Sequence, residues 1–593
     1  MKKFYLVIFF LFISQIIFTE QFKDFYFLGD SLSDIGNNPN CDSSIGSTKQ
    51  PNSRNWTQFL TKKYGLIVIK SDAGGNNFAY GGAESGYNSE EATAYDTHRG
   101  ARTQVNQLLA RNKNLNSRAV YSLYVGGNDI IGCLVEITGK TEAQVISECG
   151  PNITASLKNI HDAGARIILL GNLPDMSNTP LFFDTGEMSD TAKRMSTEYN
   201  ETVRNNVNNI GFDVIQIDLY SLFNDVLSNK TTFGFLYGPE AGAILHPGDN
   251  YDNYVFWDVV HPTQAAYKIM ADYYYSILQA PYYFSSLTEI PYKIAIARND
   301  IIRQRLLQRS TCEKKLYIFI DADPVDTFGN KYNHHKNTTL GMTVGSIYRF
   351  NKPFSIGAGF SYSPNKQSID NNAFKYDLND YAILLFADYR QNLFYLNTTT
   401  GWSYLQYRNI ARQITLGPVT ESTFANTNGY QYFVGISGGA WFPTFAGVKT
   451  GPTINSTYQY ISVDGYSENG QKNYLKMVFK NQHTNTLDAG IGWSFYFKKP
   501  ITSKNTFIMN ANVLANKQFL DNERNIHFHL QSIINSHGAV PTRIPTDYYT
   551  SVNVSMAYLF AGFMSASLGY NGYFGKDRYK NNVITLSVGI CCF

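Results

Sequence analysis

The chain has 593 residues, more than the roughly 100–200 of a typical domain, and only 16% of them are charged, with a formal net charge of +3 at pH 7. The apolar fraction of 43% excludes a disordered protein, the lack of an apolar stretch of about 18 residues after the N-terminus excludes a helical membrane protein, and the small net charge without a basic stripe excludes nucleic acid as a partner. Few charges together with 43 Tyr, 40 Phe and 46 Gly are typical of a transmembrane β-barrel.

The first 19 residues have the layout of a secretory signal. Met1-Lys2-Lys3 is positively charged, residues 4–18 are almost wholly apolar, and polar residues begin at Thr19. Because this apolar part is too short for a spanning helix, we expect residues 1–19 to be cleaved during export. An uncleaved anchor is the alternative, since no A-x-A cleavage pattern is present.

Residues 20–288 have the pattern of an α/β domain. Four short apolar runs are typical of buried parallel strands, three of them ending in Gly followed by Asp or Asn: residues 25–28, 120–125, 166–170 and 214–217. Helical patterns lie between them, as in residues 103–111 and 191–208. Alternating strands and helices predict a doubly wound parallel sheet, with ligands at the carboxyl ends of the strands.

Residues 311–593 change to an alternation of period two. From Phe354 to Tyr362, every even position is apolar or aromatic and every odd position is Ser or Gly. Residues 487–495 show the same alternation. About twelve such segments predict an antiparallel barrel with one face toward lipid and one toward a polar lumen. A soluble β-sandwich would also alternate, but the large aromatic residues on the apolar face and the low charge favour the membrane barrel.

A basic helix is expected between the two parts, over residues 289–310. It contains Arg298, Arg303, Arg305 and Arg309. A narrow barrel has a polar interior, so this helix could lie in the lumen and pair with acidic side chains there. A solvent-exposed linker helix is the alternative.

The cysteines and histidines show no metal-site spacing. Cys133 and Cys149 could pair in an oxidising compartment, although the sequence alone leaves this open. The adjacent His334 and His335 lie in a polar segment and are expected in a loop.

Two segments of residues 20–288 contain candidates for a nucleophile and for the donors of an oxyanion hole. Ser31 follows the run ending at Gly29-Asp30, so its hydroxyl would point into the crevice above the sheet and its N–H would join a helix N-terminus suited to an oxyanion. A simple helix cap is the alternative for this segment. Gly81-Gly82 allows a close approach of backbone N–H groups to a ligand, or a plain turn.

Two further elements complete the set. Asn128 follows the second apolar run, where its side-chain amide could donate to a developing oxyanion, although an Asn in a strand-end turn would look the same. Asp258 and His261 are three residues apart, so the carboxylate can orient the imidazole, which can then remove the proton from Ser31.

Together, the Gly-Asp-Ser-Leu and Asp-x-x-His-Pro elements and the order of the four segments resemble the GDSL, or SGNH, family of serine esterases and lipases over about residues 24–285. The resemblance implies a flavodoxin-like fold with Ser31, Asp258 and His261 as the catalytic triad. It implies an oxyanion hole made by the Ser31 N–H, the Gly81 N–H and the Asn128 side chain, with Gly82 as the competing donor. It requires no metal or organic cofactor.

The whole layout of signal, hydrolase, basic helix and C-terminal barrel resembles a type V autotransporter of a Gram-negative bacterium. This implies an outer-membrane protein with its hydrolase passenger at the cell surface, acting on an ester or lipid. It also implies the barrel-insertion machinery and periplasmic chaperones as partners during biogenesis. The terminal Phe593 fits the family's barrel ending, but the alternation at residues 584–590 is out of phase with it.

Three alternatives remain open at this level. The Ser33–Asn37 extension resembles members that are phospholipases, including phospholipase A and lysophospholipase, or acyltransferases on lipids. A surface adhesin or biogenesis protein could carry a vestigial esterase site, and the passenger could be released from its barrel. Acyl-chain preference is expected to depend on loops such as residues 239–253.

Overall fold

The computed structural model describes residues 21–43, 49–87, 99–309, 315–327, 337–351, 353–444, 447–520, 523–543, 548–575 and 580–592. The expected signal at residues 1–19, the His334-His335 pair and Phe593 lie outside these residues. None of the helices in the described part of the chain is both long enough and apolar enough to cross a membrane.

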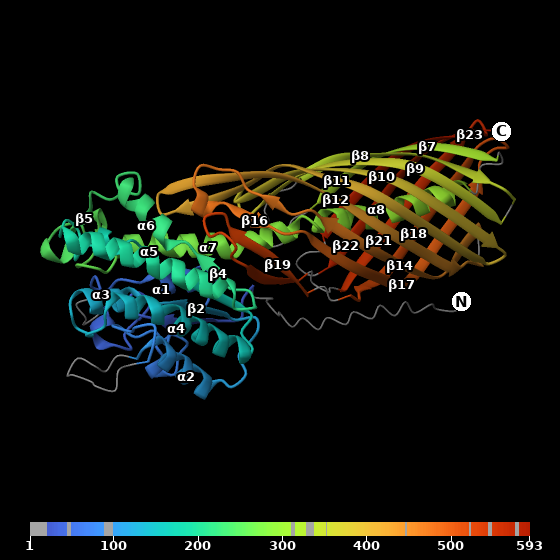
Figure 1. Cartoon of the computed structure of the whole chain (residues 1–593). Helices are drawn as coiled ribbons and strands as arrows, with labels where there is room; N and C mark the ends of the chain where they lie inside the picture. The colour runs from blue at the N-terminus through green and yellow to red at the C-terminus, as the bar shows by residue number, and fades with distance from the viewer. Residues whose placement is uncertain are drawn as a thin grey trace.

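The N-terminal half contains the expected parallel sheet (Figure 1). Its strands lie in the order β1-β2-β3-β4 and span Phe25–Gly29, Val120–Tyr124, Ile167–Gly171 and Ile215–Ile217. On the free edge of β1, the segment around Asn77 runs parallel to it, with the Phe78 N–H donating to the Phe27 carbonyl at 2.7 Å. The four predicted strands are therefore confirmed, each to within one or two residues at its ends.

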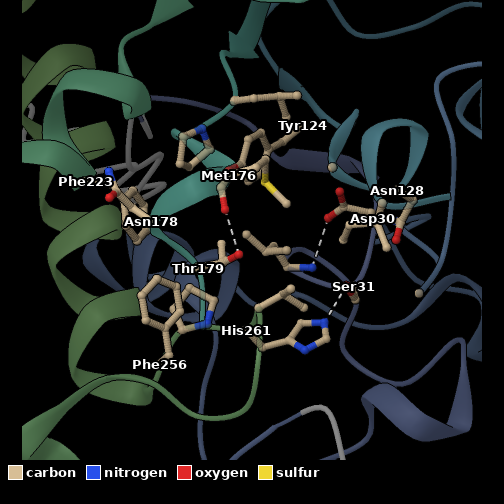
Figure 2. A pocket seen from close by; sticks show the side chains of 18 of the residues that line it. Asp30, Ser31, Tyr124, Asn128, Met176, Asn178, Thr179, Phe223, Phe256 and His261 are labelled. Atoms are coloured by element: carbon tan, nitrogen blue, oxygen red, sulfur yellow. Dashed lines mark hydrogen bonds between the residues drawn. The ribbon is translucent and has the colours of Figure 1, made fainter. Parts of the chain in front are cut away.

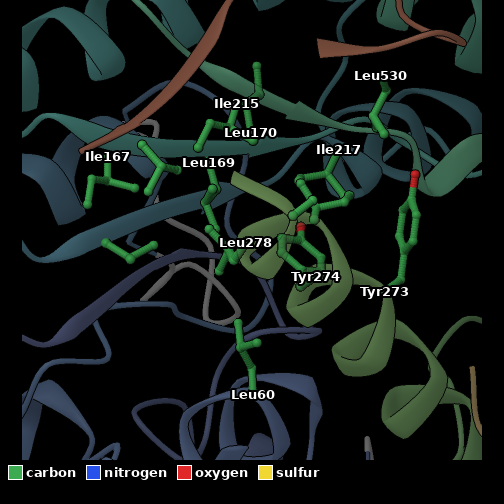
Figure 3. Packing of buried hydrophobic residues seen from close by; sticks show 14 of the residues in the cluster. Leu60, Ile167, Leu169, Leu170, Ile215, Ile217, Tyr273, Tyr274, Leu278 and Leu530 are labelled. Carbon is green, nitrogen blue, oxygen red and sulfur yellow. The ribbon is translucent and has the colours of Figure 1, made fainter. Parts of the chain in front are cut away.

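The helices of this half form two packed groups. Helix α1 packs on α7, while α4 packs on both α2 and α5. Figure 3 shows Tyr274 and Leu278 of α7 beside sheet residues, including Leu169 and Ile217. The helices span Trp56–Lys63 (α1), Ala101–Arg111 (α2), Gly127–Leu134 (α3), Glu142–Asp162 (α4), Glu187–Asn208 (α5), Leu219–Ser228 (α6) and Gln264–Ser286 (α7). The short strands β5 and β6 span Tyr237–Gly242 and Tyr254–Phe256, and the short helices Pro39–Cys41, Ser71–Ala73, Met176–Asn178, Ala243–Leu245 and Tyr251–Asn253 connect the larger elements.

The C-terminal half is a closed antiparallel barrel. The sheet runs β12-β11-β10-β9-β8-β7-β23-β22-β21-β18-β17-β14, and β14 pairs back with β12, so twelve strands close it, with the two-residue β13 at its margin. The strands span Leu316–Thr327 (β7), Asn337–Arg349 (β8), Phe354–Ile369 (β9), Phe374–Gln391 (β10), Phe394–Leu416 (β11), Val419–Ala440 (β12), Phe442–Pro443 (β13), Val448–Val463 (β14), Gln482–Pro500 (β17), Thr506–Gln518 (β18), Tyr548–Phe560 (β21), Met564–Gly575 (β22) and Lys580–Cys592 (β23).

The period-two pattern separates the two faces of the barrel wall. In β17, Ile491 and Trp493 are exposed on the outside, whereas Asp488 and Ser494 are buried inside. In β23, the alternating apolar residues 584–590 are exposed in the same way. An apolar outer face and a polar interior are what a lipid-embedded barrel needs, so the predicted membrane barrel is confirmed.

Helix α8 (Glu289–Arg309) lies inside this barrel (Figure 1). Arg298 pairs with Asp380 of β10 at 2.9 Å, and Arg305 pairs with Asp321 of β7 at 2.8 Å. All four side chains are at most 3% exposed. Arg298 and Arg305 are therefore matched to individual acidic residues on the barrel wall, whereas Arg303 pairs with Asp300 of the same helix at 2.9 Å.

The two halves share one hydrophobic core. A small sheet, β15-β16-β19-β20, continues from the barrel toward the hydrolase half and spans Tyr466–Ser467, Met477–Phe479, Glu523–Leu530 and Gly538–Arg543, with the short helix Asn473–Leu475 beside it. The Tyr273 hydroxyl of α7 donates to the Tyr474 carbonyl at 2.7 Å. Figure 3 shows Leu530 of β19 close to Tyr273. The hydrolase is thus packed on the barrel and not only linked to it.

The cysteine pairing considered from the sequence does not form. Cys133 near the end of α3 and Cys149 in α4 are both free thiols. Cys591 belongs to a disulfide whereas Cys592 is free, so these two neighbours are not bonded to each other.

Candidate active site

Of the residues predicted for catalysis, Ser31, Gly81, Asn128 and His261 line one pocket at the carboxyl edge of the parallel sheet, and Figure 2 labels Ser31, Asn128 and His261 there. Ser31 follows β1, Asn128 lies in the first turn of α3 after β2, and His261 precedes α7. Strands of a parallel sheet all end at the same edge, which brings Ser31 and Asn128 together. His261 follows the short strand β6 outside this sheet and contacts Ser31 across 230 residues of sequence.

Ser31, His261 and Asp258 form a continuous hydrogen-bonded chain. His261 Nε2 lies 2.7 Å from Ser31 Oγ, and His261 Nδ1 lies 2.7 Å from Asp258 Oδ2. The other carboxylate oxygen accepts the Val260 N–H at 2.8 Å and the His261 N–H at 2.7 Å. With Nδ1–H donating to the carboxylate, Nε2 is left to accept the Ser31 hydroxyl proton.

The surroundings of Asp258 keep its carboxylate ionised. Burial acts to raise its pKa, but the neighbouring His261 imidazole and the backbone N–H groups of His261 and Val260 outweigh burial and hold the pKa below its usual value. A permanent negative charge at this point would stabilise the imidazolium that forms when His261 takes a proton.

Backbone and side-chain donors surround the space beside Ser31. Among the described residues, no acceptor is found for the Ser31 N–H or the Gly82 N–H, and both residues line the pocket. The Asn128 amide donates one hydrogen to the Ala83 carbonyl at 3.0 Å, so its second hydrogen remains for a ligand.

The Gly81 N–H is already engaged, which corrects its predicted role. It donates to Asp34 Oδ2 at 2.9 Å. A Cβ at position 81 would also lie 2.5 Å from the Cys41 sulfur, so this glycine serves close packing. Gly82 is the competing donor considered from the sequence, and among the described residues no acceptor is found for its N–H. Its φ of +85° is a backbone conformation that favours glycine.

Asp34 holds two loops together, a role that its place in the sequence did not predict. Its carboxylate is fully buried and accepts four backbone N–H groups at 2.8–2.9 Å, those of Gly36, Asn37, Asn38 and Gly81. It therefore fixes the loop after the nucleophile to the loop that carries Gly82. An aspartate side chain can accept the N–H two residues further on in an Asx-turn, and Asp34 with Gly36 at that distance was the available hint.

Two more buried carboxyl groups flank the site. Asp129 accepts the Ser85 hydroxyl at 2.6 Å and the Ser85 N–H at 2.9 Å, and burial raises its pKa to about 6. Asp30 is 3% exposed and lines the pocket. Burial, supported by the charge of Asp129 and opposed by the Leu32 N–H and His261, raises the pKa of Asp30 to about 7.

We expect Asp30→Asn to stabilise the fold in a pH-dependent way. At pH 4, nearly all of the folded chains and about half of the unfolded ones keep Asp30 protonated, so this group changes the stability by less than about 1 kcal/mol there. As the pH rises toward 7, the unfolded chain releases this proton while the folded chain keeps it, so the wild type loses up to roughly 4 kcal/mol of stability. In the wild type, Asp30 Oδ1 accepts the Leu32 N–H at 3.0 Å. An asparagine side chain keeps this oxygen acceptor but carries no negative charge. The variant should melt higher than wild type at pH 8 and equally at pH 4; an equal difference at both pH values would contradict this assignment.

The pocket beside Ser31 has a volume of about 240 Å³ and a mainly apolar wall. Its apolar side chains are suited to an acyl chain: Ile131, Leu173, Met176, Phe223, Leu227 and Phe256. Asn178 and Thr179 add polar groups on one side (Figure 2). The apolar wall comes from residues 173–179 and 223–227 together with Ile131 and Phe256, and not from residues 239–253, which were expected to set acyl-chain preference.

Two family models match this sequence, one in each half of the chain. Residues 25–274 match the family model described as GDSL-like Lipase/Acylhydrolase, and residues 325–571 match the model described as Autotransporter beta-domain. The chain is 24% identical to Lipase 1 of Photorhabdus luminescens, over 88% of each chain, and 23% identical to Esterase EstA of Pseudomonas aeruginosa, over 94% of this chain and 93% of that one. Among solved structures, the translocator domain of autotransporter NalP from Neisseria meningitidis aligns with a TM-score of 0.38 at 15% identity, covering 51% of this chain and 98% of that chain.

Proposed function

We propose that this chain, a GDSL-like lipase and acylhydrolase domain joined to an autotransporter β-domain, cleaves carboxylic esters through an acyl-enzyme formed on Ser31. The chain is a carboxylic-ester hydrolase of the outer membrane, with the hydrolase domain at the cell surface. The observation that carries the proposed mechanism is the pair of 2.7 Å contacts that join Asp258 through His261 to Ser31 at the pocket.

In the first half of the reaction, Ser31 Oγ attacks the ester carbonyl while His261 Nε2 takes the hydroxyl proton. The imidazolium is held by Asp258 and then donates its proton to the leaving alcohol. In the second half, His261 activates a water molecule, which attacks the acyl-enzyme and releases the acid. No step needs a group beyond these side chains and water.

The tetrahedral oxyanion would be held by three donors: the Ser31 N–H, the Gly82 N–H and the Asn128 amide. Gly82 replaces Gly81 in this proposal because the Gly81 N–H is bound to Asp34. The apolar wall of the pocket supports an acyl chain of some length as the acid part of the substrate.

The division of the chain follows from the same layout. We infer a cleaved signal at residues 1–19, the hydrolase at 20–288, the lumen helix at 289–310 and the barrel at 311–593. Barrel-insertion machinery and periplasmic chaperones would act during biogenesis, as they do for other barrels of the outer membrane. The shared core with β15, β16 and β19 supports a hydrolase that stays attached.

An acyl-enzyme predicts a burst of product. Purified full-length protein mixed with excess p-nitrophenyl butyrate should release about one equivalent of p-nitrophenol before the steady state, provided that deacylation is slower than acylation. Mass spectrometry after rapid quenching should place a butyryl group on the peptide that contains Ser31. A butyryl group on another residue would contradict the proposed nucleophile.

We expect Asn128→Ala to lower kcat by about 10²–10³ with little change in KM, because an oxyanion donor acts mainly on the transition state. Asn178→Ala is a matched control, since this amide also lines the pocket but bonds to Asn224 at 3.1 Å. Steady-state kinetics of both variants provide the test. Equal losses in the two variants would remove Asn128 from the oxyanion hole.

A further inference from the structure

Six large apolar side chains remain exposed on the loops around the active-site pocket. We name them the distal apolar rim: Phe183, Leu236, Tyr237, Ile244, Leu245 and Val259. Leu245 is 70% exposed, although burying a leucine is normally favourable. The rim residues come from four separate segments of the chain, so their gathering is a property of the fold.

Backbone hydrogen bonds tie the rim to the catalytic loop. Val259 directly follows Asp258, and its carbonyl accepts the Leu181 N–H at 2.9 Å. The Ile244 N–H donates to the Trp257 carbonyl at 2.7 Å. The Phe183 N–H donates to the carbonyl of Thr179, which lines the pocket, at 2.9 Å. A surface seated on the rim would therefore lie at the loops that build the active site.

The rim faces away from the protein's own membrane. Figure 1 places β5, which begins at Tyr237, at the end of the hydrolase farthest from the barrel. The barrel crosses the outer membrane, so the bilayer that holds it lies at the opposite end of the molecule. The rim can meet only material outside the cell.

Charges around the rim are mostly negative. Five exposed carboxylates lie within the same segments: Asp184, Glu187, Glu240, Asp249 and Asp252. The one lysine in this region, Lys230, is paired with Glu240. A surface of this sign repels anionic lipids and tolerates zwitterionic ones.

We propose that the distal apolar rim docks the enzyme onto a zwitterionic lipid surface outside its own cell, from which the acyl chain of an ester lipid enters the pocket. This inference rests on the proposed function, and it specifies the substrate as lipid presented in a bilayer. The apolar rim and the pocket wall share two loops, since Phe183 is bonded to Thr179 and Val259 precedes Val260, and both Thr179 and Val260 line the pocket. Burial of the rim would supply the binding free energy.

Docking is tested apart from hydrolysis on cells that display the Ser31→Ala protein, incubated with fluorescent phosphatidylcholine vesicles. Replacing Ile244 and Leu245 by Gln should lower vesicle retention by at least about tenfold. The matched control replaces Ile67 and Ile69 by Gln; these are 75% and 49% exposed but belong to the segment beside Asp24, at the opposite end of β1. The control should retain vesicles like the parent, and phosphatidylglycerol vesicles should be retained less than phosphatidylcholine vesicles.

With Ser31 intact, the rim variant should hydrolyse dissolved p-nitrophenyl acetate within twofold of wild type but lose vesicle-lipid hydrolysis in parallel with docking. Equal vesicle retention by the rim variant and the control would overturn the proposal. It would also be overturned if the rim substitutions converted a dimer into monomers and left vesicle retention unchanged. Vesicle retention that depends on the rim, without hydrolysis of any ester, would support docking and reject the proposed function.

Discussion

Ser31→Ala is expected to lower kcat for ester hydrolysis by about 10⁴–10⁶ while leaving the protein folded and inserted. The hydroxyl lies 2.7 Å from His261 Nε2, and no other side chain in the described pocket offers an alcohol or thiol in contact with this imidazole. Without the nucleophile, only oxyanion stabilisation and substrate binding remain. The measurement is kcat of the purified full chain on p-nitrophenyl butyrate.

Ser33→Ala is the control for this substitution. Ser33 belongs to the same loop and is also buried, but its hydroxyl accepts the Trp56 indole N–H at 3.2 Å and does not reach His261. The kcat of the Ser33→Ala variant should remain within about fivefold of wild type, because a hydroxyl that does not contact His261 takes no part in the attack on the ester. A Ser31→Ala protein that keeps more than a few per cent of activity would mean that another residue, or a bound water, attacks the ester.

The second large effect concerns the barrel lumen. Arg305→Met would leave Asp321 buried without its partner, and both side chains are 0% exposed. Breaking a buried ion pair in this way costs about 3–5 kcal/mol, so we expect the folded barrel to melt at a clearly lower temperature and to accumulate less. Heat-modifiable migration on a gel reports the folded fraction of the barrel.

The double variant Arg305→Met with Asp321→Leu separates loss of charge balance from loss of packing. Since an apolar pair can replace a buried ion pair at little cost, it should recover most of the lost stability. The exposed pair Lys158–Asp162 provides the contrast, because Lys158→Met should change stability by less than about 1 kcal/mol. A single Arg305→Met variant as stable as wild type would show that this pair does not hold α8 in the lumen.

The sequence predicted those features that depend on local patterns. Ser31 and the Asp258–His261 pair could be found because each lies in a short motif whose spacing suits its chemistry. The barrel could be predicted because alternation along a strand directly reflects its two environments, as Ile491 and Asp488 illustrate.

Features that depend on contacts between distant segments could not be predicted. Gly81 and Gly82 are equivalent in sequence, and only the bond from the Gly81 N–H to Asp34 distinguishes them. The pocket wall uses residues such as Phe223 and Leu227, which lie in an ordinary amphipathic helix and its C-terminal end. Likewise, four arginines predicted a basic helix, but the pairing of Arg305 with Asp321 depends on the register of α8 in the barrel.

Hydrolysis of p-nitrophenyl esters of increasing chain length by intact cells tests the central claim most directly. Cells that display the wild-type protein should release p-nitrophenol, and cells with equal amounts of correctly inserted Ser31→Ala protein should release none above the background of cells without the protein. Equal rates for the two proteins, or activity that appears only after the cells are lysed, would contradict a surface ester hydrolase that acts through Ser31.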